Sequence, residues 1–345
     1  MGINKLILSE NSMSRIVTYV LILLLSSNTA LFGQACCSGG VPISSNLGLS
    51  SGQKQSWQFL LTYDFNSMND LIDNSSLLVD DTRRRATHSN LFEVNYGLTE
   101  KITLTGMVSI IRQERTIKTI SEKKDFTYTQ GLGDGAILLK YQLSSNDVDA
   151  KSQLLVGAGP KIPIGRTNFK NNIGLSLPAD MQPGSGAWDV ILWSYFSRAG
   201  FIWPNFSLTA TSIYRYTGTN RHYNETQFYR FGNEFQFNLG FNNRFVVGTM
   251  LMDAMLVFRY RNQTADLVDE EKFPSSGGQW VYVVPGININ FSPDFSLRLS
   301  GDIPIYRKLD GTQLTTSYKT TAAIYYTFSR KPKTDIIPTT LKTKN

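Results

Sequence analysis

The sequence predicts an all-β protein, a single antiparallel up-and-down transmembrane β-barrel of about twelve strands, with ten to fourteen as the range. Apolar and polar residues alternate with a period of two along most of the chain after residue 50. The longest alternating stretches reach about 15 residues, whereas strands of soluble proteins average ~5–6. The connections between them alternate in length, which is typical of a barrel with short turns at one membrane face and long loops at the other.

The alternation is clear in EFQFNLGF, from Glu234 to Phe241, where apolar residues take every second position. Successive side chains of a strand point to opposite faces, so each such stretch has one apolar and one polar face. Stretches of this kind, one per expected strand, centre on Leu60, Phe92, Thr105, Leu138, Val156, Leu192, Thr209, Phe235, Met252, Val284, Leu297 and Ala323.

The connections support a membrane barrel. Short ones carry Gly, Asn, Asp or Pro, as tight turns require, and lie at 97–101, 144–149, 200–205, 240–244 and 292–294. Long polar ones are expected at 66–85, 113–125, 166–185, 218–225, 262–277 and 307–315. Aromatic residues near the strand ends resemble two interfacial girdles; beside the long loops these are Tyr63, Phe65, Tyr214, Tyr216, Phe258, Tyr260, Trp280 and Tyr282.

Closure follows from the lipid environment. Backbone groups in lipid must be paired, so a spanning sheet cannot leave an edge exposed. An even number of strands places both ends of the barrel at the periplasmic side. The last stretch, Thr321 to Phe328, resembles the closing strand of outer-membrane barrels, with Ala323 where a glycine is usual.

The N-terminus predicts export. Arg15 provides a positive start, Ile16 to Leu25 an apolar run too short to span a membrane, and Gly33 to Ala35 a small-residue cleavage site. Residues 1–35 therefore read as a signal peptide of an outer-membrane protein, with translation starting at Met1 or Met13.

The expected mature chain has three parts. A short periplasmic segment (36–54) precedes the barrel (55–328), and a basic periplasmic tail (329–345) follows it. Cys36 and Cys37 are the two cysteines of the chain; lipidation, a disulfide and a metal role are the alternatives for them. No motif of basic and aromatic residues accompanies the basic tail, so no nucleic-acid partner is expected.

Three short motifs carry a family resemblance. They are GLGDGAILLKYQL from Gly131, KIPIG from Lys161 to Gly165, and PGSGAWD from Pro183 to Asp189. This order resembles the family named "MetA-pathway of phenol degradation", outer-membrane barrels described as transporters. The resemblance implies outer-membrane transport, with small aromatic or hydrophobic compounds as the candidate solutes.

The inward-facing charges are the candidate site. Residue parity places seven cations and six anions in the barrel interior: Asp64, Glu93, Asp134, Lys140, Lys161, Arg215, Arg230, Glu234, Asp253, Arg259, Arg298, Asp302 and Lys319. Mixed signs suit either ion pairs that fill the interior or a pore lining. Eight-stranded barrels fill with side chains and ~16–18 strands leave a water channel, so a narrow or occluded interior is expected.

These observations favour a passive channel or facilitator for small molecules, not an enzyme. An alternative is a lipid-modifying enzyme, for which His88 and Ser89 are neighbours, although neighbours on a strand face opposite sides. Another is a structural or surface-binding barrel that uses its long loops. The expected partners are membrane lipid, a small solute and the barrel-assembly machinery; no cofactor or metal is expected, and the oligomeric state stays open.

Overall fold

The computed structural model describes residues 54–119, 123–144 and 151–329. The predicted signal peptide, the segment that carries Cys36 and Cys37, and the basic tail after Ser329 lie outside these residues. Within the described ranges, no helix is both long and apolar enough to cross a membrane.

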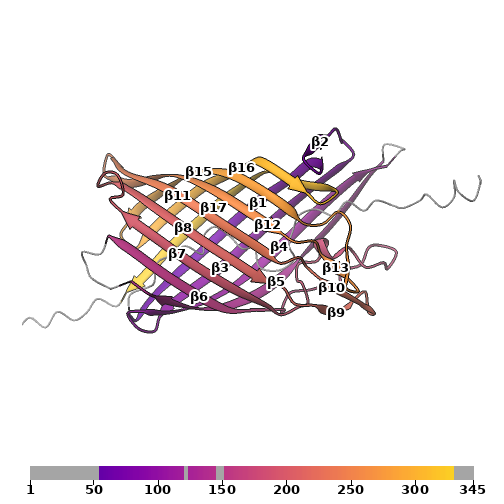
Figure 1. The fold of residues 1–345 in the computed structure, drawn as a ribbon, viewed down its shortest axis with the longest axis horizontal. Helices are drawn as coiled ribbons and strands as arrows, with labels where there is room; N and C mark the ends of the chain where they lie inside the picture. Colours follow the sequence, from indigo (N-terminus) through magenta and orange to yellow (C-terminus); the bar gives the residue numbers. More distant parts are fainter. Residues whose placement is uncertain (1–53, 120–122, 145–150, 330–345) are drawn as a thin grey trace, which may run out of the picture. The chain divides into compact units, whose positions relative to one another are not determined.

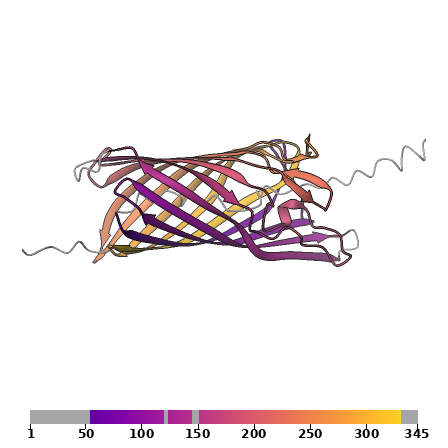
Figure 2. The ribbon, with the colours of Figure 1, turned by 90° about the horizontal axis from the view of Figure 1, so that it is seen from below.

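Twelve long strands form one closed antiparallel barrel (Figures 1 and 2). Each pairs with its neighbour, and the ring closes where the first strand pairs with the last, from Ser56 opposite Ser329 to Asp73 opposite Thr312. Every predicted strand centre falls in one of these strands, so the fold prediction is confirmed. The strands are β1 (Ser56–Asp73), β3 (Arg83–Gly97), β4 (Ile102–Lys118), β5 (Lys124–Gln142), β6 (Ser152–Ile162), β7 (Asp189–Ala199), β8 (Phe206–Tyr216), β11 (Glu234–Val247), β12 (Met250–Gln263), β15 (Gly278–Ser292), β16 (Phe295–Leu309) and β17 (Thr312–Ser329).

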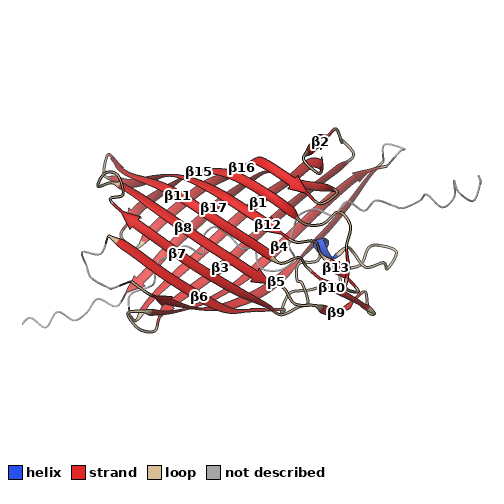
Figure 3. Ribbon diagram, in the orientation of Figure 1, coloured by secondary structure: helices blue, strands red, loops and turns tan. Residues whose placement is uncertain are grey.

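Smaller elements gather at one end of the barrel, which we call the long-loop end (Figure 3). A short strand β2 (Ser76–Leu78) extends the β1–β3 hairpin. A separate four-stranded sheet, the small sheet, has the order β14–β13–β10–β9. Its strands are β9 (Asn220–Tyr223), β10 (Gln227–Arg230), β13 (Leu267–Val268) and β14 (Glu271–Lys272). A 3-10 turn, η2, spans Ala179–Met181.

The predicted long connections were wrong in three places. The segments 66–85, 113–125 and 307–315 are mostly strand, and β16 and β17 are joined at the tight turn around Gly311. These hairpins continue the barrel ladder with polar side chains, so polarity there marks exposure to water and not the end of a strand. The long connections that remain run over 163–188, 217–233 and 264–277.

Exposure follows the predicted alternation. Along β1, Phe59 is 43% exposed on the outer face while the neighbouring Leu60 and Thr62 are buried in the interior. The interior is nevertheless less polar than the sequence indicates. Trp280 and Tyr282, expected in an interfacial girdle, are buried inside the barrel.

A second interior group is also apolar. It comprises Leu91, Met107, Ala136, Leu138, Leu155, Ile191, Trp193 and Ile213. A barrel of this size has little room for water across its whole section, so side chains of both kinds fill it.

Candidate functional site in the barrel interior

The second half of the β6–β7 loop (163–188) folds into the barrel end instead of outward. β6 ends at Ile162, opposite Gly135, so the part of β5 nearest the long-loop end has no strand on that side. The loop takes this place: the backbone N–H of Arg166 donates to the carbonyl of Leu132 (3.1 Å). Most residues from Leu177 to Asp189 are buried, which an outward loop would not allow.

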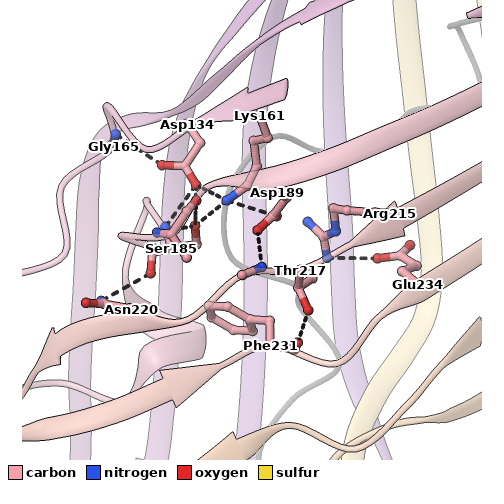
Figure 4. A network of polar contacts seen from close by, with 12 residues as sticks. Asp134, Lys161, Gly165, Ser185, Asp189, Arg215, Thr217, Asn220, Phe231 and Glu234 are labelled. Carbon is pink, nitrogen blue, oxygen red and sulfur yellow. Dashed lines mark hydrogen bonds and ion pairs between the residues drawn. The ribbon is translucent and has the colours of Figure 1, made fainter. Parts of the chain in front are cut away.

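Four buried side chains fix the base of this loop (Figure 4). Lys161 pairs with Asp134 (2.6 Å) and Asp189 (3.0 Å) and contacts the hydroxyl of Ser185. The Asp134 carboxylate also accepts hydrogen bonds from the backbone N–H groups of Gly165 and Ser185, each at 3.1 Å. A buried lysine is tolerated only where opposite charge and hydrogen bonds replace water. We call Asp134, Lys161, Ser185 and Asp189 the Lys161 cluster.

The Lys161 cluster joins the three sequence motifs. Asp134 comes from GLGD, Lys161 from KIPIG, and Ser185 and Asp189 from PGSGAWD. The glycines have a packing role here. A Cβ on Gly184 would lie 2.5 Å from the carbonyl carbon of Gly165, so the two backbones touch only because both residues lack a side chain.

Strands β3 and β5 hold the η2 turn of the loop. Arg85 of β3 pairs with Asp180 and donates a second hydrogen bond to the Asp180 carbonyl (2.8 Å). The hydroxyl of Thr129 on β5 donates to the Met181 carbonyl (2.6 Å).

The same turn packs against the connection that carries part of the small sheet. Ala179 lies in one buried cluster with Tyr229 of β10 and Phe231, which precedes β11. The η2 turn therefore lies between β3 on one side and the small sheet on the other, at the long-loop end.

Most of the predicted interior charges are in ion pairs. Besides the Lys161 cluster, these pairs include Lys140 with Glu93 (3.5 Å), Arg215 with Glu234 (3.1 Å), Lys319 with Asp64 (3.2 Å) and Arg259 with Asp302. Asp253 pairs with Arg244 (2.7 Å), which was not predicted. Arg298 stands over the ring of Tyr325 (4.9 Å to the centroid). Arg230 lies on β10 of the small sheet, over the ring of Tyr216 (5.0 Å).

Sequence reasoning missed several partners in these networks. Arg85 has the inward parity of Ser89 and Glu93, so parity alone could have found it. Asp189, the second carboxylate on Lys161, opens β7 and is the last residue of the PGSGAWD motif. Asp180 carries no such signal, because its position depends on how the loop folds.

Two of the cavities among the described residues concern solute passage. The interior cavity has a volume of about 240 Å³ and is lined by residues of β7, β8, β11, β12, β15 and β16. The outer cavity, about 970 Å³, lies at the long-loop end between 230–233, 262–279 and 308–311. No group of three or more His, Cys, Asp or Glu side chains in the described part of the chain is placed to hold a metal ion.

The loop at the outer cavity contains a perturbed acid. Burial raises the pKa of the Asp266 carboxyl, although the Tyr229 hydroxyl and the Gly232 N–H donate hydrogen bonds to it. Burial and the Asp266 charge together raise the pKa of the Tyr229 phenol well above its usual value. This pair links the small sheet to the β12–β15 connection.

His88 and Ser89 do not form a joint site. The ring Nδ1 of His88 is 2.8 Å from the hydroxyl of Tyr63, which is exposed on the outer face. Ser89 is buried in the interior. The strand wall separates the two side chains.

A closed barrel with an apolar outer face and a charged interior defines the class of protein: an outer-membrane β-barrel. No protein-family model matches the chain, and no curated protein matches it. Among solved structures, the chain is similar to an outer membrane channel from Pseudomonas putida F1, with 11% identity, a TM-score of 0.65, and coverage of 83% of this chain and 100% of the other.

Two further solved structures are similar at a lower level. The toluene transporter TodX of P. putida has 9% identity and a TM-score of 0.41, covering 85% of this chain and 96% of the other. The β domain of the Bordetella autotransporter BrkA has 12% identity and a TM-score of 0.43, covering 80% and 100%. At these identities the likeness is one of fold.

Proposed function

We propose that this protein is an outer-membrane channel or facilitator for the passive passage of small molecules. The observation that carries the proposal is the interior cavity of about 240 Å³, lined with polar and charged side chains together with the apolar Met255, Val257 and Val284. A barrel that served only as a membrane anchor would gain nothing from such a space. The neighbour from P. putida F1 is described as an outer membrane channel, which agrees with this proposal.

The family and the solute class belong to the same proposal. The three motifs that resemble the "MetA-pathway of phenol degradation" family meet in the Lys161 cluster, which favours membership of that family. Aromatic or hydrophobic compounds are the solute class that this membership implies. The interior charges named above would then line or frame the solute path.

The inward loop favours a facilitator over an open pore. Its second half lies at the long-loop end, where the buried Arg85–Asp180 ion pair holds the η2 turn and hydrogen bonds from Gly165 and Ser185 to Asp134 hold the base. Solutes would pass either after the loop shifts or through the outer cavity beside the loop. The expected leader at 1–35 and periplasmic segments at both ends complete the proposed topology.

Planar-bilayer conductance of the purified full-length protein, together with swelling of proteoliposomes in small solutes, tests the function. We expect small, gated conductance steps and swelling by solutes of single-ring size. A barrel that passes no ion and no solute at any voltage or pH would refute the proposal.

A further inference from the structure

The interior cavity has a positive bias. Three arginines and one aspartate line it: Arg244, Arg259, Arg298 and Asp253. Arg244 pairs with Asp253 at the wall, and Arg259 pairs with Asp302 behind it. An anionic group that enters the cavity therefore meets more positive than negative charge.

Two buried donors at the cavity wall have no acceptor. Asn238 on β11 and Arg259 on β12 are direct cross-strand partners, and the Arg259 Nε donates to the Asn238 Oδ1 (2.9 Å). The Nη2 of Arg259 and the Nδ2 of Asn238 have no hydrogen-bond partner in the part of the chain that the structure describes. Both residues are only 5% exposed.

Such donors need an oxygen acceptor, because a buried unpaired donor is costly. The positive charge of the guanidinium selects the acceptor. Both residues line the cavity, and a carboxylate offers one oxygen to each donor and forms a charge-assisted hydrogen bond with the guanidinium, which is stronger than a neutral one. A hydroxyl or carbonyl oxygen lacks the negative charge that makes this pairing strong.

The same cavity has an apolar wall next to these donors. Met255 and Val257 precede Arg259 on the inward face of β12, and Val284 lies opposite Val257 on β15. An apolar cavity of ~150 Å³ holds one benzene molecule. About 240 Å³ therefore has room for one ring together with a carboxylate.

We propose that the interior cavity binds small monocarboxylic acids with an apolar body. Arg259 and Asn238 bind the carboxylate, and Met255, Val257 and Val284 contact the apolar part. The inference rests on the proposed function, because it names the solute class of that channel. A bound carboxylate would also give acceptors to the two donors of Arg259 and Asn238 that the ion pairs of the interior leave unpaired.

Equilibrium dialysis of the full-length protein in detergent, with benzoate as the probe, tests the inference. Benzyl alcohol, which keeps the ring without the carboxylate, and acetate, which keeps the carboxylate without the ring, are the comparisons. We expect benzoate to bind roughly tenfold or more tightly than either. Equal binding of benzoate and benzyl alcohol, or of benzoate and acetate, would overturn the assignment.

Two variants locate the site. Asn238→Asp places a negative charge beside the carboxylate, and Arg259→Lys keeps a positive charge near Asp302 but removes the second guanidinium N–H. Each should weaken benzoate binding about tenfold or more and leave benzyl alcohol binding unchanged. Matched controls are Asn205→Asp in the exposed β7–β8 turn and Arg112→Lys on the outer face of β4. Wild-type benzoate affinity in folded Asn238→Asp and Arg259→Lys would overturn the proposal.

The two proposals fail in different ways. Dialysis needs no open channel, so a protein that binds benzoate but passes no solute refutes the proposed function alone. A protein that conducts and swells but binds benzoate no better than benzyl alcohol refutes the carboxylate site alone. If a variant does not fold, the comparison of the three probes on the wild type still decides the inference.

Discussion

Replacing Lys161 with methionine should release the inward loop. Lys161 is fully buried between Asp134 and Asp189, so Lys161→Met leaves two carboxylates in a site without water. Removing one partner of a buried ion pair costs about 3–5 kcal/mol. Asp134, Lys161 and Asp189 belong to barrel strands, and Ser185 and the Gly165 N–H of the loop cover the two carboxylates by hydrogen-bonding to Asp134. Opening the loop would return these carboxylates to water.

The free-energy cost of Lys161→Met therefore falls mainly on the conformation in which the loop is folded inward, the closed position. A change of ~3–5 kcal/mol corresponds to roughly a hundred- to a few-thousand-fold shift from closed toward open. In planar bilayers, Lys161→Met should spend a larger fraction of time open than the wild type. The double variant Asp134→Asn with Lys161→Met carries one buried negative charge less and should recover part of the closed fraction.

Lys118→Met is the matched control, because the Lys118–Asp81 pair is exposed and such pairs contribute about 0–1 kcal/mol. Its open fraction should equal that of the wild type. If Lys161→Met gave the same open fraction and unfolding midpoint as Lys118→Met, the Lys161 cluster would not hold the loop.

Three further predictions follow from the same structure. Gly184→Ala places a Cβ against the Gly165 backbone and should cost about 1–3 kcal/mol, which lowers the midpoint of thermal unfolding. Gly106→Ala, where a Cβ meets no atom within 4 Å, should keep the wild-type midpoint. Equal midpoints for the two variants would contradict the close packing of Gly184 on Gly165. Leu61→Arg, on the lipid face of β1 between the two aromatic ends of the strand, should cost ~2–4 kcal/mol, measured by urea unfolding in lipid vesicles, and an unchanged free energy of unfolding would mean that β1 does not face lipid there. The raised pKa of Tyr229 means that the folded small sheet favours the neutral phenol, so its stability is full below the usual pKa of 10.0 and is lost as the pH rises above it. Tyr229→Phe should remove this alkaline loss of stability in fluorescence-monitored unfolding between pH 9 and 11. A variant that keeps the loss would exclude Tyr229 as its cause.

Period-two alternation, together with the length of the alternating stretches, the alternating connections and the aromatic strand ends, predicted the barrel. In β11, Phe235 to Phe241 face lipid at every second position while Gln236 and Asn238 face inward, and the strand pairs in that register. Parity likewise predicted that Asp134 and Lys161 point inward. It did not predict that Lys161 is shared with Asp189, because pairing between strands depends on register and not on local sequence.

The predicted aromatic girdle was wrong at two residues. Trp280 and Tyr282 were expected at the membrane interface, since aromatic residues at strand ends are typical of it. In the structure they are buried inside the barrel, where the Trp280 Nε1 donates to the Thr315 hydroxyl (3.0 Å). Residue type alone does not distinguish an aromatic facing lipid from one filling a narrow interior.

The sequence by itself determined the barrel, a strand number of about twelve and the lipid-facing side of most strands, because these depend on a repeat between adjacent residues. Only the tertiary structure decided that the second half of the loop at 163–188 enters the barrel end and that Asn238 and Arg259 leave two donors free in one cavity. Those features join residues distant along the chain, and their positions follow from closure of the ring and from the register of each strand pair.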